Sequence, residues 1–296
     1  MPASAWTAPV PEGDILRRTA VNLDSVLAGR ELVRAELRWP SAGGVNLVGR
    51  TVLGTRPYGK HLLTRLDDGR TLRTHLRMDG SWRVHRGGDP RVPISRPEVR
   101  AVLASEAGTA VGLLLGMLDV VRTRDEHTLI GTLGPDLLDD TFDADHEPFT
   151  GIPPGSAGPL GIAAPGGMPA RGPGPGIDAA LERWATRGPT PVAEVLLDQH
   201  VVAGIGTIFM AESLFFERIW PWTPADQVRD PARLLRTARR LMAESFRQRT
   251  PPGRVHARDG LRCMRCGGLI ALGQARKPPM QRPVYWCPRC QPAPRG

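Results

Sequence analysis

The 296-residue sequence has very few lysines. Only Lys60 and Lys277 occur among its 39 basic residues, whereas arginine, glycine and proline are abundant. The net charge of +9 favours a polyanionic partner, although the codon bias of a GC-rich genome is an alternative explanation for the excess of arginine. The same bias makes each retained lysine informative, because a lysine can release its proton and an arginine stays protonated.

The sequence also lacks a long hydrophobic run. Its most apolar stretch, residues 110–121, is short and contains Asp119, so it cannot span a bilayer. Residues 1–14 have neither the basic start nor the apolar centre of a secretory signal. These absences predict a cytoplasmic protein with no membrane partner.

Cysteine is absent from most of the chain. The four cysteines form two C-x-x-C pairs separated by twenty residues: Cys263 and Cys266, then Cys287 and Cys290. Each pair lets two thiolates reach one tetrahedral ion, so the spacing predicts one structural Zn²⁺ held by a zinc ribbon. Disulfides are the alternative but do not suit a cytoplasmic chain, and a redox site needs only one pair. Basic residues between the pairs, Arg276, Lys277 and Arg282, favour a nucleic-acid partner.

The patterning divides the chain into five segments. Residues 14–28 have helical spacing, and short β-type runs such as HLLTRL at 61–66 follow as far as residue 133. Gly and Pro then dominate a stretch with little to bury, and a second helical region comes next. We therefore expect an extra or non-native extension (1–10), a helix with a β-sandwich (11–146), a disordered linker (147–176), a helical domain (177–254) and the ribbon (255–296).

Six motifs occur in a fixed order along the chain. They are PEGD at 11–14, GKH at 59–61, HLRMDGSW at 75–82, LGPDLL at 133–138, DQHVVAGIGTIFMAE at 198–212 and the four-cysteine ribbon. Together they resemble the formamidopyrimidine-DNA glycosylase and endonuclease VIII family, most closely its actinobacterial endonuclease VIII-like branch. The resemblance covers 11–146 and 177–291.

This resemblance implies an α+β protein with an N-terminal helix plus antiparallel β-sandwich, a helix–two-turn–helix DNA-binding domain and a C-terminal zinc ribbon. It implies a bifunctional DNA glycosylase and AP lyase of base excision repair that flips an oxidised base, here a pyrimidine, out of the duplex. An N-terminal proline forms a Schiff base with the sugar, and β/δ-elimination then nicks the strand. The expected partners are damaged duplex DNA and abasic-site DNA, bound by a monomer at the nucleoid.

Three residues match the catalytic positions of the family. Pro11 corresponds to the nucleophile and Glu12 to the adjacent acid, while Lys60 corresponds to a lysine that contacts phosphate and assists the lyase step. His75 resembles a phosphate-contacting residue, although a histidine satisfied within the sandwich is a serious alternative. Met78 matches the side chain that fills the space left by the flipped base, with an ordinary core methionine as the alternative.

The remaining matches concern the DNA backbone. The turn of Gly204, Ile205 and Gly206 resembles the one whose backbone amides approach phosphate. Thr207 departs from the family, which usually has asparagine there, and its shorter reach weakens the expected contact. Arg282 matches the ribbon arginine that reaches the DNA backbone.

The position of Pro11 raises a chemical problem. An internal proline nitrogen is an amide and is not nucleophilic, whereas a terminal proline is a free secondary amine. We expect synthesis to begin at position 10, where a GTG start codon would read as Val10 and removal of the initiator would expose Pro11. If residues 1–10 are retained, the alternative is a non-catalytic protein that binds lesions or junctions. A plain zinc-ribbon nucleic-acid module with an unrelated β domain is a third reading, which the ordered motifs disfavour.

Overall fold

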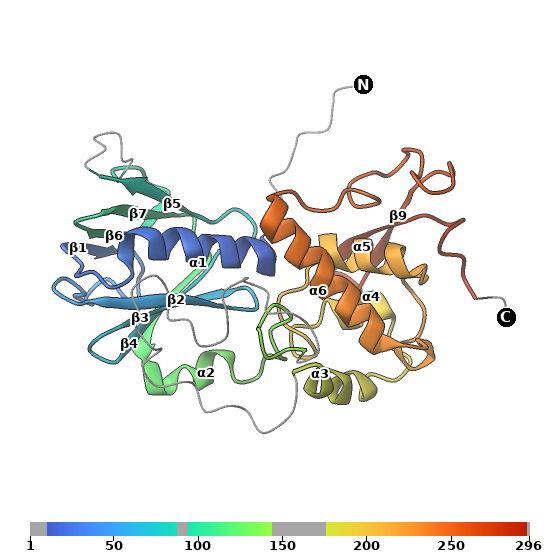
Figure 1. The fold of residues 1–296 in the computed structure, drawn as a ribbon, viewed down its shortest axis with the longest axis horizontal. Coiled ribbons are helices and arrows are strands. Elements are labelled where there is room, and N and C mark those ends of the chain that lie inside the picture. The colour runs from blue at the N-terminus through green and yellow to red at the C-terminus, as the bar shows by residue number, and fades with distance from the viewer. Residues whose placement is uncertain (1–10, 88–93, 144–175, 295–296) are drawn as a thin grey trace. The chain divides into compact units, whose positions relative to one another are not determined.

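The computed structural model describes residues 11–87, 94–143 and 176–294 (Figure 1). The expected extension over residues 1–10 and, apart from Gly176, the expected linker over 147–176 lie outside these ranges. The chain divides into two compact units, one ending at Thr132 and one beginning at Leu133. We describe each unit by itself.

The first unit consists of one long helix and two four-stranded sheets. Helix α1 spans Gly13–Leu27. The strands that follow are β1 (Arg34–Leu37), β2 (Val52–Tyr58), β3 (His61–Leu66), β4 (Arg70–His75), β5 (Ser81–Arg86), β6 (Val99–Ser105), β7 (Gly108–Leu113) and β8 (Met117–Arg122). The strand orders are β1-β6-β7-β5 and β2-β3-β4-β8, with antiparallel pairing throughout. A 3₁₀ turn (Thr123–Asp125) and the short helix α2 (His127–Ile130) end the unit. The predicted helix and antiparallel sandwich are confirmed.

Helix α1 and both sheets share one core. The helix buries Leu16, Leu23 and Leu27, whose spacing brings them to one face, against Leu62 of β3 and Leu103 of β6. Burying each of these side chains stabilises the fold by about 2 kcal/mol. This packing holds the start of α1, and the residues just before it, in a defined place within the unit.

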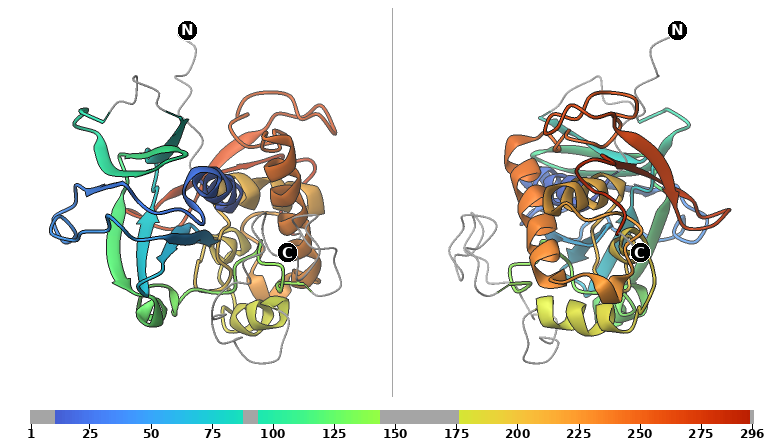
Figure 2. Two further views of the ribbon diagram at one scale, coloured as in Figure 1. Left: turned by 60° about the vertical axis from the view of Figure 1, so that its left-hand side comes forward. Right: turned by 90° about the vertical axis from the view of Figure 1, so that its right-hand side faces the viewer.

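The second unit contains helices and a hairpin. The helices are α3 (Gly176–Ala185), α4 (Val192–Leu196), α5 (Thr207–Glu217) and α6 (Pro231–Gln248), with a 3₁₀ turn at Ala225–Gln227, and the hairpin is β9 (Ala271–Ala275) with β10 (Arg282–Trp286). The side chain of Asp230 accepts the N–H of Arg233 and Pro231 occupies the first turn, so α6 begins with a favourable cap. Two further views show the helices and hairpin of this unit (Figure 2).

The helices and the ribbon are parts of one core. Ile270, Val284 and Cys287 belong to the same buried cluster as Phe209 of α5 and Leu235 of α6. A ribbon of this size cannot bury enough apolar surface alone, which explains why it shares the core of its neighbour.

Residues 133–143 also belong to the second unit, which differs from the boundary expected at residue 146. Leu137 and Phe142 lie in its core, and the N–H of Leu137 donates to the carbonyl of Ala203 at 3.0 Å. The LGPDLL motif follows the strands of the first unit in the sequence, but its Leu137 side chain packs in the core of the second unit. Within the described ranges, every helix is too short or too polar to span a bilayer.

Candidate functional site

Pro11 and Glu12 lie at the start of α1. Glu12 occupies the cap position, and its carbonyl accepts the N–H groups of Ile15 at 2.9 Å and Leu16 at 3.1 Å. Its side chain is fully buried but makes no capping hydrogen bond to the helix. Since removing a carboxyl group from water is costly, a buried acid beside Pro11 that does not cap the helix is a candidate for chemistry.

Lys60 lies on a tight turn between two strands. Tyr58 and His61 pair across β2 and β3, so Gly59 and Lys60 form a two-residue connection. Gly59 has a φ of +57°, a conformation that glycine adopts without strain. The hairpin therefore presents a half-buried Lys60 at a defined place on the unit.

His75 ends β4 and is paired with His61 in the neighbouring strand. The two rings meet edge to face with centroids 4.9 Å apart. Burial, together with the nearby charges of Lys60, Arg77 and Arg73, lowers the pKa of His75 to about 4. His75 is therefore neutral at pH 7, and the structure brings it close to Lys60.

The tautomer of the neutral His75 ring follows from its hydrogen bond. Its Nδ1 atom accepts the backbone N–H of Arg77 at 2.8 Å. The single ring proton must then lie on Nε2, which makes Nε2 a hydrogen-bond donor. Part of the ring is thus satisfied locally, as the structural alternative expected, while the other nitrogen can donate to an anionic ligand.

His61 was not identified as a site residue, although it stands in the GKH motif. Burial lowers its pKa to about 3, with the charges of His75 and Arg73 contributing. Among the described residues its buried Nδ1 atom has no hydrogen-bond partner. We refer to His61 and His75 together as the histidine pair.

Met78 lies on the turn between β4 and β5, and 63% of its surface is exposed. The interpretation of Met78 as an ordinary core methionine is therefore wrong. Arg77 before it has a left-handed φ of +52°. A Cβ atom at Gly80 would lie 2.3 Å from the carbonyl oxygen of Leu76, so only glycine fits there. These features hold Met78 outward on a shaped turn.

The glycine turn of the second unit precedes α5. Gly204 has a φ of +107°, and its N–H donates to Oε1 of Gln199 at 2.9 Å, so this amide is used within the protein. The Nε2 atom of Gln199 donates to the carbonyl of Ile205 at 2.9 Å. Gln199 therefore clamps the turn from both sides, a role that sequence reasoning missed although it stands in the DQH motif. Gly206 is the cap residue of α5.

Thr207 is the first residue of α5 and is half-buried. In the described part of the chain, neither its amide nor its hydroxyl has a hydrogen-bond partner. Both donors lie at the positive end of the helix dipole, where an anion is stabilised. The donors that the turn can offer are therefore centred on Thr207 rather than on the Gly204 amide.

The four cysteines lie together and are not disulfide-bonded. Their Sγ atoms all lie within 4.8 Å of one another. The Sγ atoms of Cys263 and Cys290 are 3.9 Å apart, and those of Cys266 and Cys287 are 3.4 Å apart. The N–H of Arg265 donates to Cys263 Sγ at 3.4 Å, as occurs in metal-binding knuckles. The cluster can hold one metal ion.

Two buried polar side chains, not identified from the sequence, anchor the ribbon to α5 and to the loop that follows it. Gln291 accepts the N–H of Cys287 at 3.0 Å and donates to the carbonyl of Ile219 at 2.8 Å. The carboxyl group of Glu212 accepts three backbone N–H groups at 2.9–3.1 Å, from residues 254, 255 and 256. Burial raises the pKa of Glu212. With Gln199, these residues are the α5 anchors.

The basic residues between the cysteine pairs have different environments. Arg282 is exposed at the start of β10, and among the residues that the structure describes its Nη1 atom donates to the carbonyl of Gln281 alone, at 2.8 Å. Arg276 instead holds the hairpin to the helices, because its N–H donates to Glu194 and its Nη2 atom donates to the carbonyl of Leu197. Arg282 is thus available to a ligand, whereas Arg276 has a structural role.

Two family models match the chain. The formamidopyrimidine-DNA glycosylase N-terminal domain matches residues 10–112, and the formamidopyrimidine-DNA glycosylase H2TH domain matches residues 177–251. The first match begins one residue before Pro11.

Several proteins are similar to the chain along its length. A probable endonuclease 8 2 of Streptomyces coelicolor is 35% identical over 97% of this chain and 96% of that protein. The DNA-(apurinic or apyrimidinic site) lyase Nei2 of Mycolicibacterium smegmatis is 31% identical over 96% of this chain and 100% of its own length. The crystal structure of Lactococcus lactis formamidopyrimidine-DNA glycosylase, bound to DNA containing an AP site, superposes with a TM-score of 0.71 at 18% identity over 95% of this chain and 100% of that one.

Proposed function

Because the chain belongs to the formamidopyrimidine-DNA glycosylase and endonuclease VIII family, we propose that it excises oxidised pyrimidines from duplex DNA and then cuts the strand at the resulting abasic site. Its function is that of a DNA glycosylase and AP lyase. The non-catalytic alternative gains no support, since the relatives are named as enzymes. It acts as a monomer on the DNA of the nucleoid, in the cytoplasm.

The observation that carries the proposal is the Pro11–Glu12 pair at the head of α1. The amine of a terminal proline has a pKa near 8, so about a tenth is neutral at pH 7 and can attack C1′ of the sugar. The base leaves with a proton and a C1′–nitrogen bond forms; the C1′–O4′ bond then breaks, O4′ takes a proton as the sugar ring opens, and the C1′–nitrogen linkage becomes a cationic iminium. Loss of the C2′ proton then expels the 3′ phosphate, and a second elimination expels the 5′ phosphate. We assign to Glu12 the transfer of protons to and from the sugar.

Lys60, His75 and Met78 are assigned to the DNA around the damaged nucleotide. Lys60 attracts a phosphate and exchanges a proton during elimination, and the neutral His75 donates its Nε2 proton to a phosphate oxygen. Met78, held outward on its turn, fills the space that the flipped base leaves. In the second unit the start of α5 at Thr207 and the exposed Arg282 contact the DNA backbone.

The four cysteines are proposed to hold one structural Zn²⁺. A tetrahedral zinc with Zn–S bonds of about 2.3 Å places its sulfur atoms about 3.8 Å apart. The observed separations of 3.4 and 3.9 Å lie on either side of this value. The ion would stabilise the ribbon that carries Arg282 and would take no part in the chemistry.

Borohydride trapping tests the nucleophile. The start of the family match at residue 10 supports a working protein that begins at Pro11. We expect such a protein to be locked covalently onto DNA containing an oxidised pyrimidine or an abasic site. The 296-residue form, verified by mass, should give no adduct, because its Pro11 nitrogen is an amide. Equal trapping of the two forms would show that Pro11 is not the nucleophile.

A further inference from the structure

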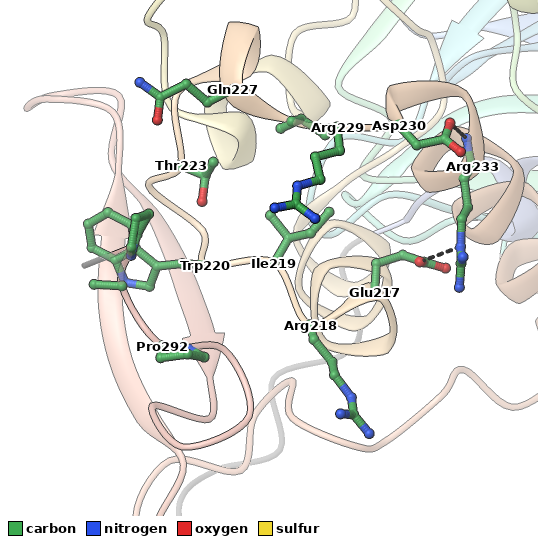
Figure 3. A pocket seen from close by; sticks show the side chains of 13 residues that line it. Glu217, Arg218, Ile219, Trp220, Thr223, Gln227, Arg229, Asp230, Arg233 and Pro292 are labelled. Carbon is green, nitrogen blue, oxygen red and sulfur yellow. Dashed lines mark hydrogen bonds and ion pairs between the residues drawn. The ribbon is translucent and has the colours of Figure 1, made fainter. Parts of the chain in front are cut away.

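A pocket of about 650 Å³ opens in the second unit beside the C-terminal end of α5 (Figure 3). Its wall comes from the end of α5, the loop that follows, the first turn of α6 and residues 292–294. The eleven residues of α5 separate the pocket from Thr207 by roughly 16 Å along the helix axis. The pocket is therefore distinct from the glycine turn at the other end of this helix.

The acidic groups of the wall already have partners. The carboxyl group of Glu217 binds Nε of Arg233 at 2.8 Å and accepts the hydroxyl of Thr237 at 2.6 Å. Asp230 accepts the N–H of Arg233 at 2.8 Å. The charge of Glu217 is thus paired with that of Arg233, whereas Asp230 keeps its negative charge, because a backbone N–H does not neutralise it.

Two other arginine side chains on this wall lie outside these contacts. Arg218 and Arg229 are exposed, and within the described residues neither side chain has an ion-pair or hydrogen-bond partner. Figure 3 shows the Arg229 side chain extending between Thr223 and Glu217 toward Ile219. The pocket thus presents two positive groups to any ligand that enters it.

The rest of the wall is partly apolar. Ile219, Trp220 and Pro292 line it, and Trp220 is held by the ring of Trp222 at a centroid distance of 5.4 Å. A ligand must therefore combine negative charge with an apolar group. The wall has no glycine-rich loop, and Asp230 already accepts the Arg233 amide at the start of α6, so the backbone adds no phosphate cradle to the two guanidinium groups.

We propose that this pocket binds an acidic segment of a partner protein, one that carries carboxylates next to an aromatic or aliphatic side chain. Guanidinium groups pair with carboxylates through two parallel hydrogen bonds, and Arg218 and Arg229 can each make such a pair. The apolar side chain packs on Trp220 and Pro292. Since the pocket and Thr207 lie at opposite ends of α5, the partner leaves the proposed DNA-binding turn free.

Fluorescence anisotropy with the full chain and a labelled peptide, acetyl-Asp-Asp-Leu-Phe-Asp-Asp-amide, tests this. We expect binding that weakens with added salt and falls about tenfold in Arg229→Gln, the effect of losing one charge-assisted pair. Arg247→Gln, an exposed arginine near the other end of α6, is the matched control and should bind as the unaltered protein does. A peptide with asparagine in place of each aspartate should not bind.

Three results would overturn the proposal. They are no binding of the acidic peptide at millimolar concentration, equal binding by Arg229→Gln and the unaltered protein, and displacement of the peptide by a single-stranded oligonucleotide, which would make the pocket a nucleic-acid site. Cleavage of a short lesion-containing duplex should be the same in Arg229→Gln and the unaltered protein. Peptide binding therefore tests the pocket, and duplex cleavage tests the proposed enzyme activity, independently of each other.

Discussion

The histidine pair of the first unit and the α5 anchors of the second unit bury polar groups in opposite ways. The pair keeps two neutral rings out of water, with His61 Nδ1 lacking a partner among the described residues. The polar side-chain atoms of the anchors Gln199, Glu212 and Gln291 form hydrogen bonds with backbone groups. Buried polar groups that are satisfied stabilise a fold, and those left unsatisfied cost stability. The first arrangement is therefore suited to ligand binding and the second to holding a shape.

Removal of the metal should give the largest effect, because the cysteine cluster, like the α5 anchors, holds the shape of the second unit. Cys287→Ala should lose the zinc and unfold the ribbon, since a structural zinc contributes about 10 kcal/mol or more to folding. Metal analysis should find one zinc per chain before the change and far less after it. Met264→Ala, an exposed residue between two of the cysteines, is the control and should keep the metal. A purified protein with well below one zinc per chain would contradict the assignment.

Lys60→Arg tests the ligand-binding role assigned to the first unit. Arginine keeps the attraction for phosphate but cannot exchange a proton at neutral pH, so strand cleavage should fall about 100-fold while DNA binding changes little. Single-turnover cleavage and binding to an uncleavable abasic analogue measure the two effects. Lys277→Arg replaces the only other lysine, which is exposed, and should leave both unchanged. Equal losses of cleavage and binding in Lys60→Arg would show that Lys60 only anchors the DNA.

Sequence patterns foresaw the elements whose signals are local. The helix expected over 14–28 is α1 (Gly13–Leu27), and HLLTRL is β3, because apolar spacing and turn residues act within one element. The four cysteines were found for the same reason, since metal spacing is a local pattern.

Contacts between distant parts of the chain left no such signal. Glu212 binds backbone groups more than forty residues away, and Gln291 reaches Ile219 across 72 positions. No periodicity marks a side chain that bonds to a distant backbone. For the same reason LGPDLL gave no sign that Leu137 would pack in the second unit.

Acid should weaken the first unit through the histidine pair. The pKa of His75 is lowered from 6.5 to about 4 on folding, so the unfolded chain binds the proton more readily between these values. The contribution of the neutral His75 ring to the free energy of unfolding is present above pH 6.5 and is lost as the pH falls toward 4, a change of about 3 kcal/mol. Urea unfolding at pH 7 and pH 4.5 measures this. His75→Asn should flatten the pH dependence, and His127→Asn, an exposed residue, should not. An unchanged slope in His75→Asn would place the acid sensitivity elsewhere.

Gln199→Ala should give the smallest effect and joins the two sides of the comparison, because this anchor shapes a proposed ligand-binding turn. The change removes the acceptor of the buried Gly204 N–H and the donor to the Ile205 carbonyl, a cost of about 2 kcal/mol. Gln199→Glu keeps the acceptor for Gly204 but loses the donor, so its loss of stability should be intermediate. If the turn positions Thr207 for phosphate, affinity for lesion DNA should fall more in Gln199→Ala than in Gln199→Glu. Lys60-dependent cleavage of bound DNA should stay the same in both. Weaker binding in Gln199→Glu than in Gln199→Ala would instead indicate that charge repulsion at the DNA, rather than the shape of the turn, controls affinity.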